Sequence, residues 1–206
     1  MNIKCIPVGN LEANCYILSD LKEAAIIDPG AEVQMLLDEI EESGLTLTKI
    51  LLTHGHFDHI GAVSELREKT GAKIYMHEND AKMPFDTGLN LGFLSNETVK
   101  PFSVDVYLNH NDTVSIGKEE LCVYHTPGHS SGSVCFVADN NLFCGDLLFK
   151  NSIGRFDYGD LKQELNSLKF LMDNFDDETV VYPGHGEKTT IGDERVNNPY
   201  IVNHVL

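Results

Sequence analysis

The chain has 206 residues, and its 15 Lys and Arg against 32 Asp and Glu leave a formal net charge of −17 at pH 7. A chain of this length is typical of one domain, and it can bury enough apolar surface to need no disulfide for stability. Nucleic acids and anionic membrane surfaces both recruit basic side chains, so they are poor matches for such an acidic chain. We therefore expect a single domain over residues 1–206 without either of these partners.

Cysteine usage and the N-terminus both indicate a reducing compartment. The first residues, Met1-Asn2-Ile3-Lys4, begin like a strand, and no apolar stretch of a secretory signal follows them. No run reaches the roughly 18 apolar residues that span a bilayer. An odd number of cysteines without a C-x-x-C pair argues against a disulfide framework and a thiolate zinc site. They are Cys5, Cys15, Cys122, Cys135 and Cys144. The sequence thus predicts a cytoplasmic protein.

The first half of the chain alternates short apolar runs with amphipathic segments. Gly, Asn and Asp separate the runs, which is typical of strands, and apolar side chains at helical spacing mark the helices. In chain order we expect strands at 3–8, 15–18 and 24–28, a helix at 31–42, a strand at 49–52, a polar loop at 53–59, a helix at about 61–69 and a strand at 73–76.

The second half begins with a long segment, residues 84–101, that has no clean period. Loops of this length in a compact domain are often functional. Asn140-Asn141 predicts a hairpin turn between two later strands. After the loop we expect strands at 114–116, 121–126, 133–138 and 142–145, a helix at 161–175, a strand at 180–182 and a short helix near Ile191. Clusters of strands with helices between them favour two sheets packed face to face under outer helices, and other α/β arrangements stay open.

Four potential metal ligands follow the predicted strand at 49–52. The segment Thr53-His-Gly-His-Phe-Asp-His59 contains His54, His56, Asp58 and His59. In an extended loop the first three alternate to one side, and a turn is needed to bring His59 round. Imidazole and carboxylate groups suit Zn²⁺, iron and manganese. A surface loop rich in histidine by chance is the plainer interpretation, but three of the nine histidines of the chain fall in this hexapeptide.

Three further candidates lie beyond the ends of later predicted strands. His129 and His185 each follow a Pro-Gly turn, which presents an imidazole just past a strand. Asp146 lies inside the apolar run Leu142-Phe-Cys-Gly-Asp-Leu-Leu-Phe149. A carboxylate in such a setting needs a partner, because burying an isolated charge costs several kcal/mol. Two divalent cations that share Asp146 would be such a partner.

These residues, in this order, resemble the metallo-β-lactamase superfamily and, within it, the glyoxalase II branch without its C-terminal helical extension. The resemblance implies an α/β (α+β) fold that is a four-layer αββα sandwich. It also implies one metal site at His54, His56 and His129, and a second at Asp58, His59 and His185. Asp146 and a hydroxide would bridge the two sites, so Asp58 and Asp146 carry the catalytic role. Zinc is the expected metal, with iron or manganese as alternatives.

The function implied is hydrolysis of a small thioester or another activated ester by attack of the bridging hydroxide. The family's β-lactamases commonly lack the histidine found here at 59, which makes penicillin hydrolysis the weaker interpretation. A lactonase remains open, as does a diiron redox or metal-binding module, although such modules usually carry Glu in place of His56. A serine hydrolase built on Ser130 is a further alternative, because Gly128-His-Ser-Ser-Gly132 fits the G-x-S-x-G pattern.

The segment Gly154-Arg-Phe-Asp-Tyr-Gly159 resembles the family's substrate segment. It predicts that Arg155 binds a substrate carboxylate and that Tyr158 donates a hydrogen bond, although a solvated turn is an equal alternative. We expect Asp28 to support the metal loop. The other histidines are expected to be structural or on the surface: His125 structural, and His77, His110 and His204 exposed.

Overall fold

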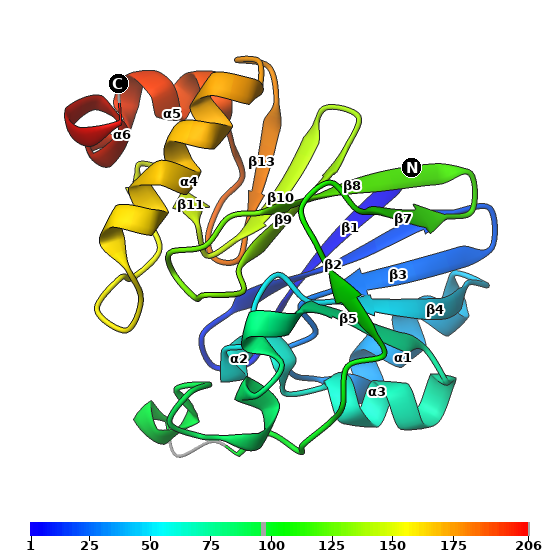
Figure 1. Ribbon diagram of the computed structural model, residues 1–206. Helices are drawn as coiled ribbons and strands as arrows, with labels where there is room; N and C mark the ends of the chain where they lie inside the picture. The colour runs from blue at the N-terminus through cyan, green and yellow to red at the C-terminus, as the bar shows by residue number, and fades with distance from the viewer. Residues whose placement is uncertain (96–97, 206) are drawn as a thin grey trace.

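Two six-stranded β-sheets pack face to face, and helices cover the outer face of each sheet (Figure 1). The computed structural model describes residues 1–95 and 98–205. This is the four-layer αββα sandwich expected from the sequence, so that prediction is confirmed.

The first sheet is built from the N-terminal half of the chain. Its strands lie in sequence order, with antiparallel pairing up to the third strand and parallel pairing from there on. The strands are β1 (Asn2–Val8), β2 (Ala13–Asp20), β3 (Glu23–Ile27), β4 (Thr46–Leu51), β5 (Lys73–His77) and β6 (Val106–Leu108). The parallel strands all end at one edge, and the polar loop 53–56 leaves the sheet there.

The second sheet comes from the C-terminal half. Its spatial order is β14 (Thr189–Thr190), β13 (Val180–Pro183), β10 (Asn141–Gly145), β9 (Val134–Ala138), β8 (Glu119–His125) and β7 (Thr113–Ile116). A small hairpin of β11 (Leu148–Phe149) and β12 (Ser152–Ile153) follows β10. Only β10 and β13 pair in parallel in this sheet, so both strands end at the same side of it.

Helices form the two outer layers. On the first sheet lie α1 (Val33–Glu42), α2 (Phe57–Ile60) and α3 (Val63–Thr70), and on the second lie α4 (Leu161–Asn174), α5 (Ile191–Asn197) and α6 (Pro199–His204) (Figure 1). The Asp160 side chain caps α4 by accepting a hydrogen bond from the backbone N–H of Gln163. No helix in the described part of the chain is long and apolar enough to cross a membrane.

Three apolar layers follow from the alternation of side chains along the strands. On β9, Cys135 and Val137 face α4, whereas Val134 and Phe136 face the first sheet. The middle layer lies between the sheets, and the outer layers lie between each sheet and its helices. Inner strands such as β2 and β9 are therefore buried on both faces, whereas the outer strands β1 and β7 keep exposed residues.

Several local predictions need correction. Some short elements were not expected from the sequence because none is longer than six residues, namely β6, β11, β12, β14, α2 and α6. Of these, α2 begins inside the predicted loop 53–59. The β9–β10 turn lies at residues 139–140, one residue earlier than expected, because Asp139 adopts a positive φ of 49°. The predicted loop 84–101 is confirmed over its described residues, with the 3₁₀ turns η2 (Met83–Phe85) and η3 (Gly92–Leu94). Residues 96–97 lie outside the described part.

Candidate metal centre

The metal loop leaves the end of β4 and enters the one-turn helix α2. Its three histidines are buried, and Asp58 is largely covered. The chain between β3 and α1 passes directly against α2: a Cβ on Gly30 would lie 1.7 Å from the backbone oxygen of Asp58. Glycine at position 30 therefore allows the close approach of the two backbones. The turn of α2 brings His59 round to the side of the preceding ligands, as the sequence required.

The remaining three candidates come from the second sheet. His129 follows β8, while Asp146 and His185 follow the parallel neighbours β10 and β13. A Cβ on Gly184 would lie 2.0 Å from Asp146 Oδ1, so glycine leaves room for that carboxylate. The centre is therefore assembled where the ends of strands from both sheets meet.

Three imidazoles converge to form the first ligand set. His56 Nδ1 and His129 Nε2 lie 2.8 Å apart, and His54 Nε2 is buried without a hydrogen-bond partner. The ligand atoms of these three residues all lie within 4.8 Å of one another. A buried nitrogen left unpaired beside two others fits a cation, because it can satisfy all three lone pairs at once.

Asp58, His59 and His185 form the second ligand set, with the same 4.8 Å limit. His185 Nε2 lies 3.1 Å from Asp58 Oδ2 and 3.3 Å from His59 Nε2. One carboxylate with two imidazoles is a common donor set for Zn²⁺ and for iron.

Asp146 lies between the two sets. One oxygen, Oδ1, is 3.4 Å from His59 Nε2, and the other, Oδ2, is 3.6 Å from His129 Nε2 and 3.7 Å from His185 Nε2. Oδ1 is also buried without a hydrogen-bond partner. The carboxylate thus reaches members of both sets and has a free buried oxygen, which fits a group shared by two cations.

Protein oxygen atoms hold the other ring nitrogen of four of these histidines. His129 Nδ1 lies 2.9 Å from the Arg155 carbonyl oxygen, and His185 Nδ1 lies 3.0 Å from that of Leu11. A hydrogen bond from Nδ1–H to a carbonyl leaves the Nε2 lone pair directed into the centre. Backbone carbonyls have no residue-type signature, so sequence reasoning missed both of these contacts.

Asp28 holds the rings of His59 and, through Thr53, of His54 in position, which agrees with the supporting role that the sequence predicted. Its carboxylate accepts hydrogen bonds from the Thr53 backbone N–H and hydroxyl, and it lies 3.0 Å from His59 Nδ1. The Thr53 hydroxyl in turn lies 3.0 Å from His54 Nδ1. Asp28 and the two histidines form a third compact group, but the carboxylate is already occupied by these donors.

The surroundings of the two ligand sets shift histidine pKa values in opposite directions. Burial lowers the pKa of His54 well below its usual range and that of His56 to about 3, so both imidazoles are neutral at physiological pH, which is the form that can bind a metal. Burial alone would lower the pKa of His59, but the carboxylates of Asp146 and Asp58 raise it instead. The carboxylates therefore stabilise positive charge on the side of the second set.

A further buried acid, Asp80, ties the two ligand-bearing loops together. Its carboxylate accepts hydrogen bonds from the backbone N–H groups of Gly55 at 3.1 Å and Gly132 at 2.7 Å, and from the Ser130 hydroxyl at 2.6 Å. Gly55 belongs to the metal loop, and Gly132 follows His129. Nothing in the sequence around Asp80 signals this role.

The structure also shows where three other residues considered in the sequence analysis lie, namely Ser130, His77 and His125. After Ser130 the chain continues into strand β9, whereas a nucleophile elbow continues into a helix. The expectation that His77 lies on the surface is wrong, because only 8% of it is exposed. Its ring stacks on that of His125, with centroids 4.0 Å apart. This stacking across β5 and β8 gives both histidines a packing partner.

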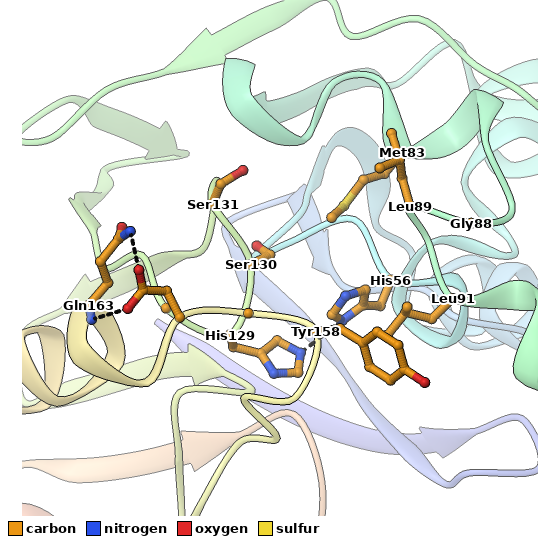
Figure 2. A pocket seen from close by; sticks show the side chains of 13 residues that line it. His56, Met83, Gly88, Leu89, Leu91, His129, Ser130, Ser131, Tyr158 and Gln163 are labelled. Carbon is orange, nitrogen blue, oxygen red and sulfur yellow. Dashed lines mark hydrogen bonds between the residues drawn. The ribbon is translucent and has the colours of Figure 1, made fainter.

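Two clefts open onto the centre and share His56, Leu91 and His129. Cleft A, of about 380 Å³, lies over both ligand sets, and its other lining residues are Leu11, Phe57, Asp58, Leu94, Ser95, Asp146, Phe149, Arg155 and His185. Cleft B, of about 320 Å³, is shown in Figure 2, with Met83, Gly88, Leu89, Gly128, Ser130, Ser131, Tyr158, Gly159, Asp160 and Gln163 as its other lining residues.

The two predicted substrate residues line different clefts. Arg155 borders cleft A and Tyr158 borders cleft B. The Arg155 guanidinium donates two hydrogen bonds to Asp157, at 2.8 and 2.6 Å, and lies 4.9 Å from the centre of the Tyr158 ring. Its charge is therefore already compensated by a neighbouring carboxylate.

Comparison with known proteins agrees with this geometry. The family model described as "Metallo-beta-lactamase superfamily" matches residues 8–185. The chain belongs to the metallo-beta-lactamase superfamily. Within the superfamily, it is 34% identical to the hydroxyacylglutathione hydrolase GloC of Haemophilus influenzae over 211 residues, covering 98% of each chain.

Solved structures of the superfamily match over almost the whole chain. The B3 metallo-beta-lactamase BLEG-1 has a TM-score of 0.93 and 37% identity, covering 98% of this chain and 100% of its own. TTHA1623, solved in a di-iron-bound form, has a TM-score of 0.87 and 36% identity, covering 96% of this chain and 99% of its own. The superfamily binds divalent metals, and the present chain holds the clusters of His and Asp that such binding needs.

Proposed function

We propose that this chain is a binuclear metal-dependent hydrolase that cleaves a small thioester or a related activated ester. The observation that carries the proposal is the position of Asp146 between two complete ligand sets, with one buried oxygen that has no partner in the protein. In this proposal His54, His56 and His129 hold one cation, and Asp58, His59 and His185 hold the second. Zinc is the proposed metal, and the di-iron form of TTHA1623 makes iron the first alternative.

When bound, divalent cations in such a pair supply Lewis acidity and lower the pKa of water. The residues around them place the substrate and keep the ligands in position. The Leu11 and Arg155 carbonyls orient His185 and His129, and cleft A admits the substrate above Asp146. In the reaction the water oxygen bonds to the acyl carbon, the carbon–sulfur bond breaks, and the sulfur leaves as a thiol with a proton derived from the water.

The likeness to a hydroxyacylglutathione hydrolase supports a thioester substrate, and the likeness to a B3 metallo-beta-lactamase makes a β-lactam the second candidate. Arg155 and Tyr158 remain the proposed substrate-binding residues, although Arg155 could bind a substrate carboxylate only by exchanging its bond to Asp157. A small-molecule substrate fits the size of both clefts. The free state of all five cysteines supports the proposed cytoplasmic location.

Metal analysis combined with a substrate panel tests the proposal. Protein loaded with Zn²⁺ or Fe²⁺ should contain about two metal ions per chain, and it should cleave thioesters with a higher kcat/KM than lactones or β-lactams. Chelation should abolish the activity. A best substrate among the β-lactams would favour the second candidate, and a metal content that never exceeds one per chain would contradict the binuclear site.

The variant Ser130→Ala separates the metal mechanism from a serine hydrolase. A nucleophilic serine is indispensable, so its loss would remove nearly all activity. In the structure the Ser130 hydroxyl donates to Asp80, and its expected role is to anchor the loop. We therefore expect Ser130→Ala to retain chelator-sensitive hydrolysis.

A further inference from the structure

We infer that cleft A selects substrates whose acyl group is an uncharged hydrocarbon chain, and that cleft B takes the more polar leaving group. This inference rests on the proposed function and adds the class of substrate to it. It starts from the walls of the two clefts, which share His56, Leu91 and His129. These three side chains are labelled in the view of cleft B (Figure 2). When the carbonyl carbon of a thioester lies over the ligand sets, its acyl chain extends into one cleft and its thiol group into the other.

The walls of cleft A are mainly apolar. Leu11, Phe57, Leu94 and Phe149 line it around the ligand residues. Leu11 is 54% exposed and Leu94 is 46% exposed, although both lie at the entrance to a charged centre. Apolar side chains that stay open to water around a functional cleft are typical of a surface that an apolar ligand covers. Phe149 packs its ring edge-on near that of His185, with centroids 6.1 Å apart, so its apolar wall adjoins the centre.

The charged side chains around cleft A also favour an uncharged acyl group. Arg155 is the one Lys or Arg among the described lining residues, and its guanidinium is bound to Asp157 through two hydrogen bonds. The guanidinium also lies over the Tyr158 ring, which holds it further in place. An anionic acyl group would thus find no uncompensated side-chain cation in the described wall. Burying its charge against leucine and phenylalanine would be unfavourable.

Outside the ligand residues, cleft B has more polar side chains than cleft A. Ser131, Gln163 and Asp160 line it together with Met83 and Leu89, and its described lining contains no Lys or Arg. The Asp160 carboxylate already accepts hydrogen bonds from the backbone N–H and the side-chain amide of Gln163. The Ser131 hydroxyl and the Gln163 amide oxygen can still form hydrogen bonds to a polar thiol carrier, which the leucine and phenylalanine side chains of cleft A cannot do. The two clefts therefore favour a substrate with an apolar acyl branch and a polar leaving branch.

A series of thioesters of one neutral thiol, N-acetylcysteamine, tests the inference. Acetyl, butyryl and hexanoyl thioesters should show kcat/KM rising by up to about fourfold for each methylene that cleft A buries. The succinyl thioester, which adds a carboxylate at similar length, should fall below the butyryl one. Calorimetric titration with the corresponding methyl ketones, which cannot be hydrolysed, should show the same order of affinity with a negative heat-capacity change.

Variants of the cleft A wall test whether that wall causes the rise of kcat/KM with acyl chain length. Leu94→Ala and Phe149→Ala should each lower the hexanoyl-to-acetyl ratio of kcat/KM, and the ketone affinities should follow. Leu21→Ala is the matched control, because Leu21 is an exposed leucine in the β2–β3 turn, at 69% exposure, and it lines neither cleft. Its ratio should equal that of the unaltered protein.

The possible failures are distinguishable. If the acetyl thioester is cleaved but longer acyl chains give no gain, or if the succinyl thioester is preferred, the assignment of cleft A is wrong and the proposed hydrolase stands. If no thioester is cleaved, both the hydrolase and the assignment fail. An equal loss of ratio in Leu21→Ala would also overturn the assignment, because the effect would then not belong to the cleft.

Discussion

Glu164 is a buried acid whose replacement has a calculable consequence for stability. It lies on α4 beneath Gly128 of the His129 loop, with none of its surface exposed and neither carboxyl oxygen in a hydrogen bond. Burial, with the nearby charge of Asp146 adding to it, raises its pKa from 4.5 to about 8. The folded protein therefore holds a proton on Glu164 at a pH where the unfolded chain has released it.

The sign of the effect follows from linkage between proton binding and folding. Between the unfolded and folded pKa values of Glu164, the folded state binds the additional proton, so the free energy of unfolding falls as the pH rises through this window. For pKa values of 4.5 and about 8, the loss between about pH 5 and about pH 9 is about 4 kcal/mol. Glu164→Gln removes the titrating group and keeps the shape. Its stability should match that of the unaltered protein below about pH 4 and exceed it by about 5 kcal/mol near pH 9.

Urea unfolding at a series of pH values measures the difference, with a chelator present so that no cation near Asp146 alters the local charge. Glu42→Gln, on the exposed end of α1, is the control for the same change in net charge. Its stability profile should run parallel to that of the unaltered protein. If Glu164→Gln also runs parallel, Glu164 is ionised in the folded protein across this range and the reasoning from its burial is refuted.

Three other substitutions test the centre and its supports. Asp146→Ala should lose one or both metal ions by elemental analysis while circular dichroism shows the fold retained, because the shared anion is gone; full metal content would contradict the bridging position. Asp80→Ala should lower the free energy of unfolding by about 3 kcal/mol in chemical denaturation, because it removes the acceptor of the buried Gly55 and Gly132 N–H groups and of the Ser130 hydroxyl. Arg155→Ala should lower kcat/KM for an anionic thioester by roughly 2- to 30-fold, since a charge-assisted contact worth about 1.5 to 3 kcal/mol replaces an exposed ion pair with Asp157 worth at most about 1 kcal/mol; an unchanged kcat/KM would show that Arg155 does not bind the substrate.

The convergence of the candidate ligand residues could be predicted because their signals are local. Four lie within the six residues 54–59, and the other three stand at recognisable strand ends, two after a Pro-Gly turn and Asp146 in an apolar run. The metal loop needed a turn to redirect His59, and α2 supplies it. The layers of the sandwich could be predicted in outline for the same reason, since strand and helix periodicity belong to short segments.

The supports of the centre could not be predicted, because they depend on contacts between distant segments. The Leu11 carbonyl that holds His185 is 174 residues away in sequence, and any residue type could provide it. Asp80 resembles an ordinary acid in a polar turn until the fold brings Gly55 and Gly132 to its carboxylate. His77 was misplaced on the surface because its polar neighbours in sequence say nothing of His125, which covers it from the other sheet.

In the proposed hydrolase, different parts of the molecule carry out the reaction and select the substrate. The seven candidate ligands come from strand ends and the helix α2, which the two sheets and their three apolar layers hold in place. Half of the cleft lining comes from segments without candidate ligands, namely the β1–β2 turn, the described part of the loop before β6 and the segment 154–160, whereas Phe57 lies between two candidate ligands. A change at Leu11 or Leu94 can therefore alter which acyl group fits without moving an imidazole. The carbonyls of Leu11 and Arg155 are the exception, because they belong to the cleft segments and also orient His185 and His129. Their side chains can change with the substrate that fits the cleft, whereas their backbone positions are constrained by the centre.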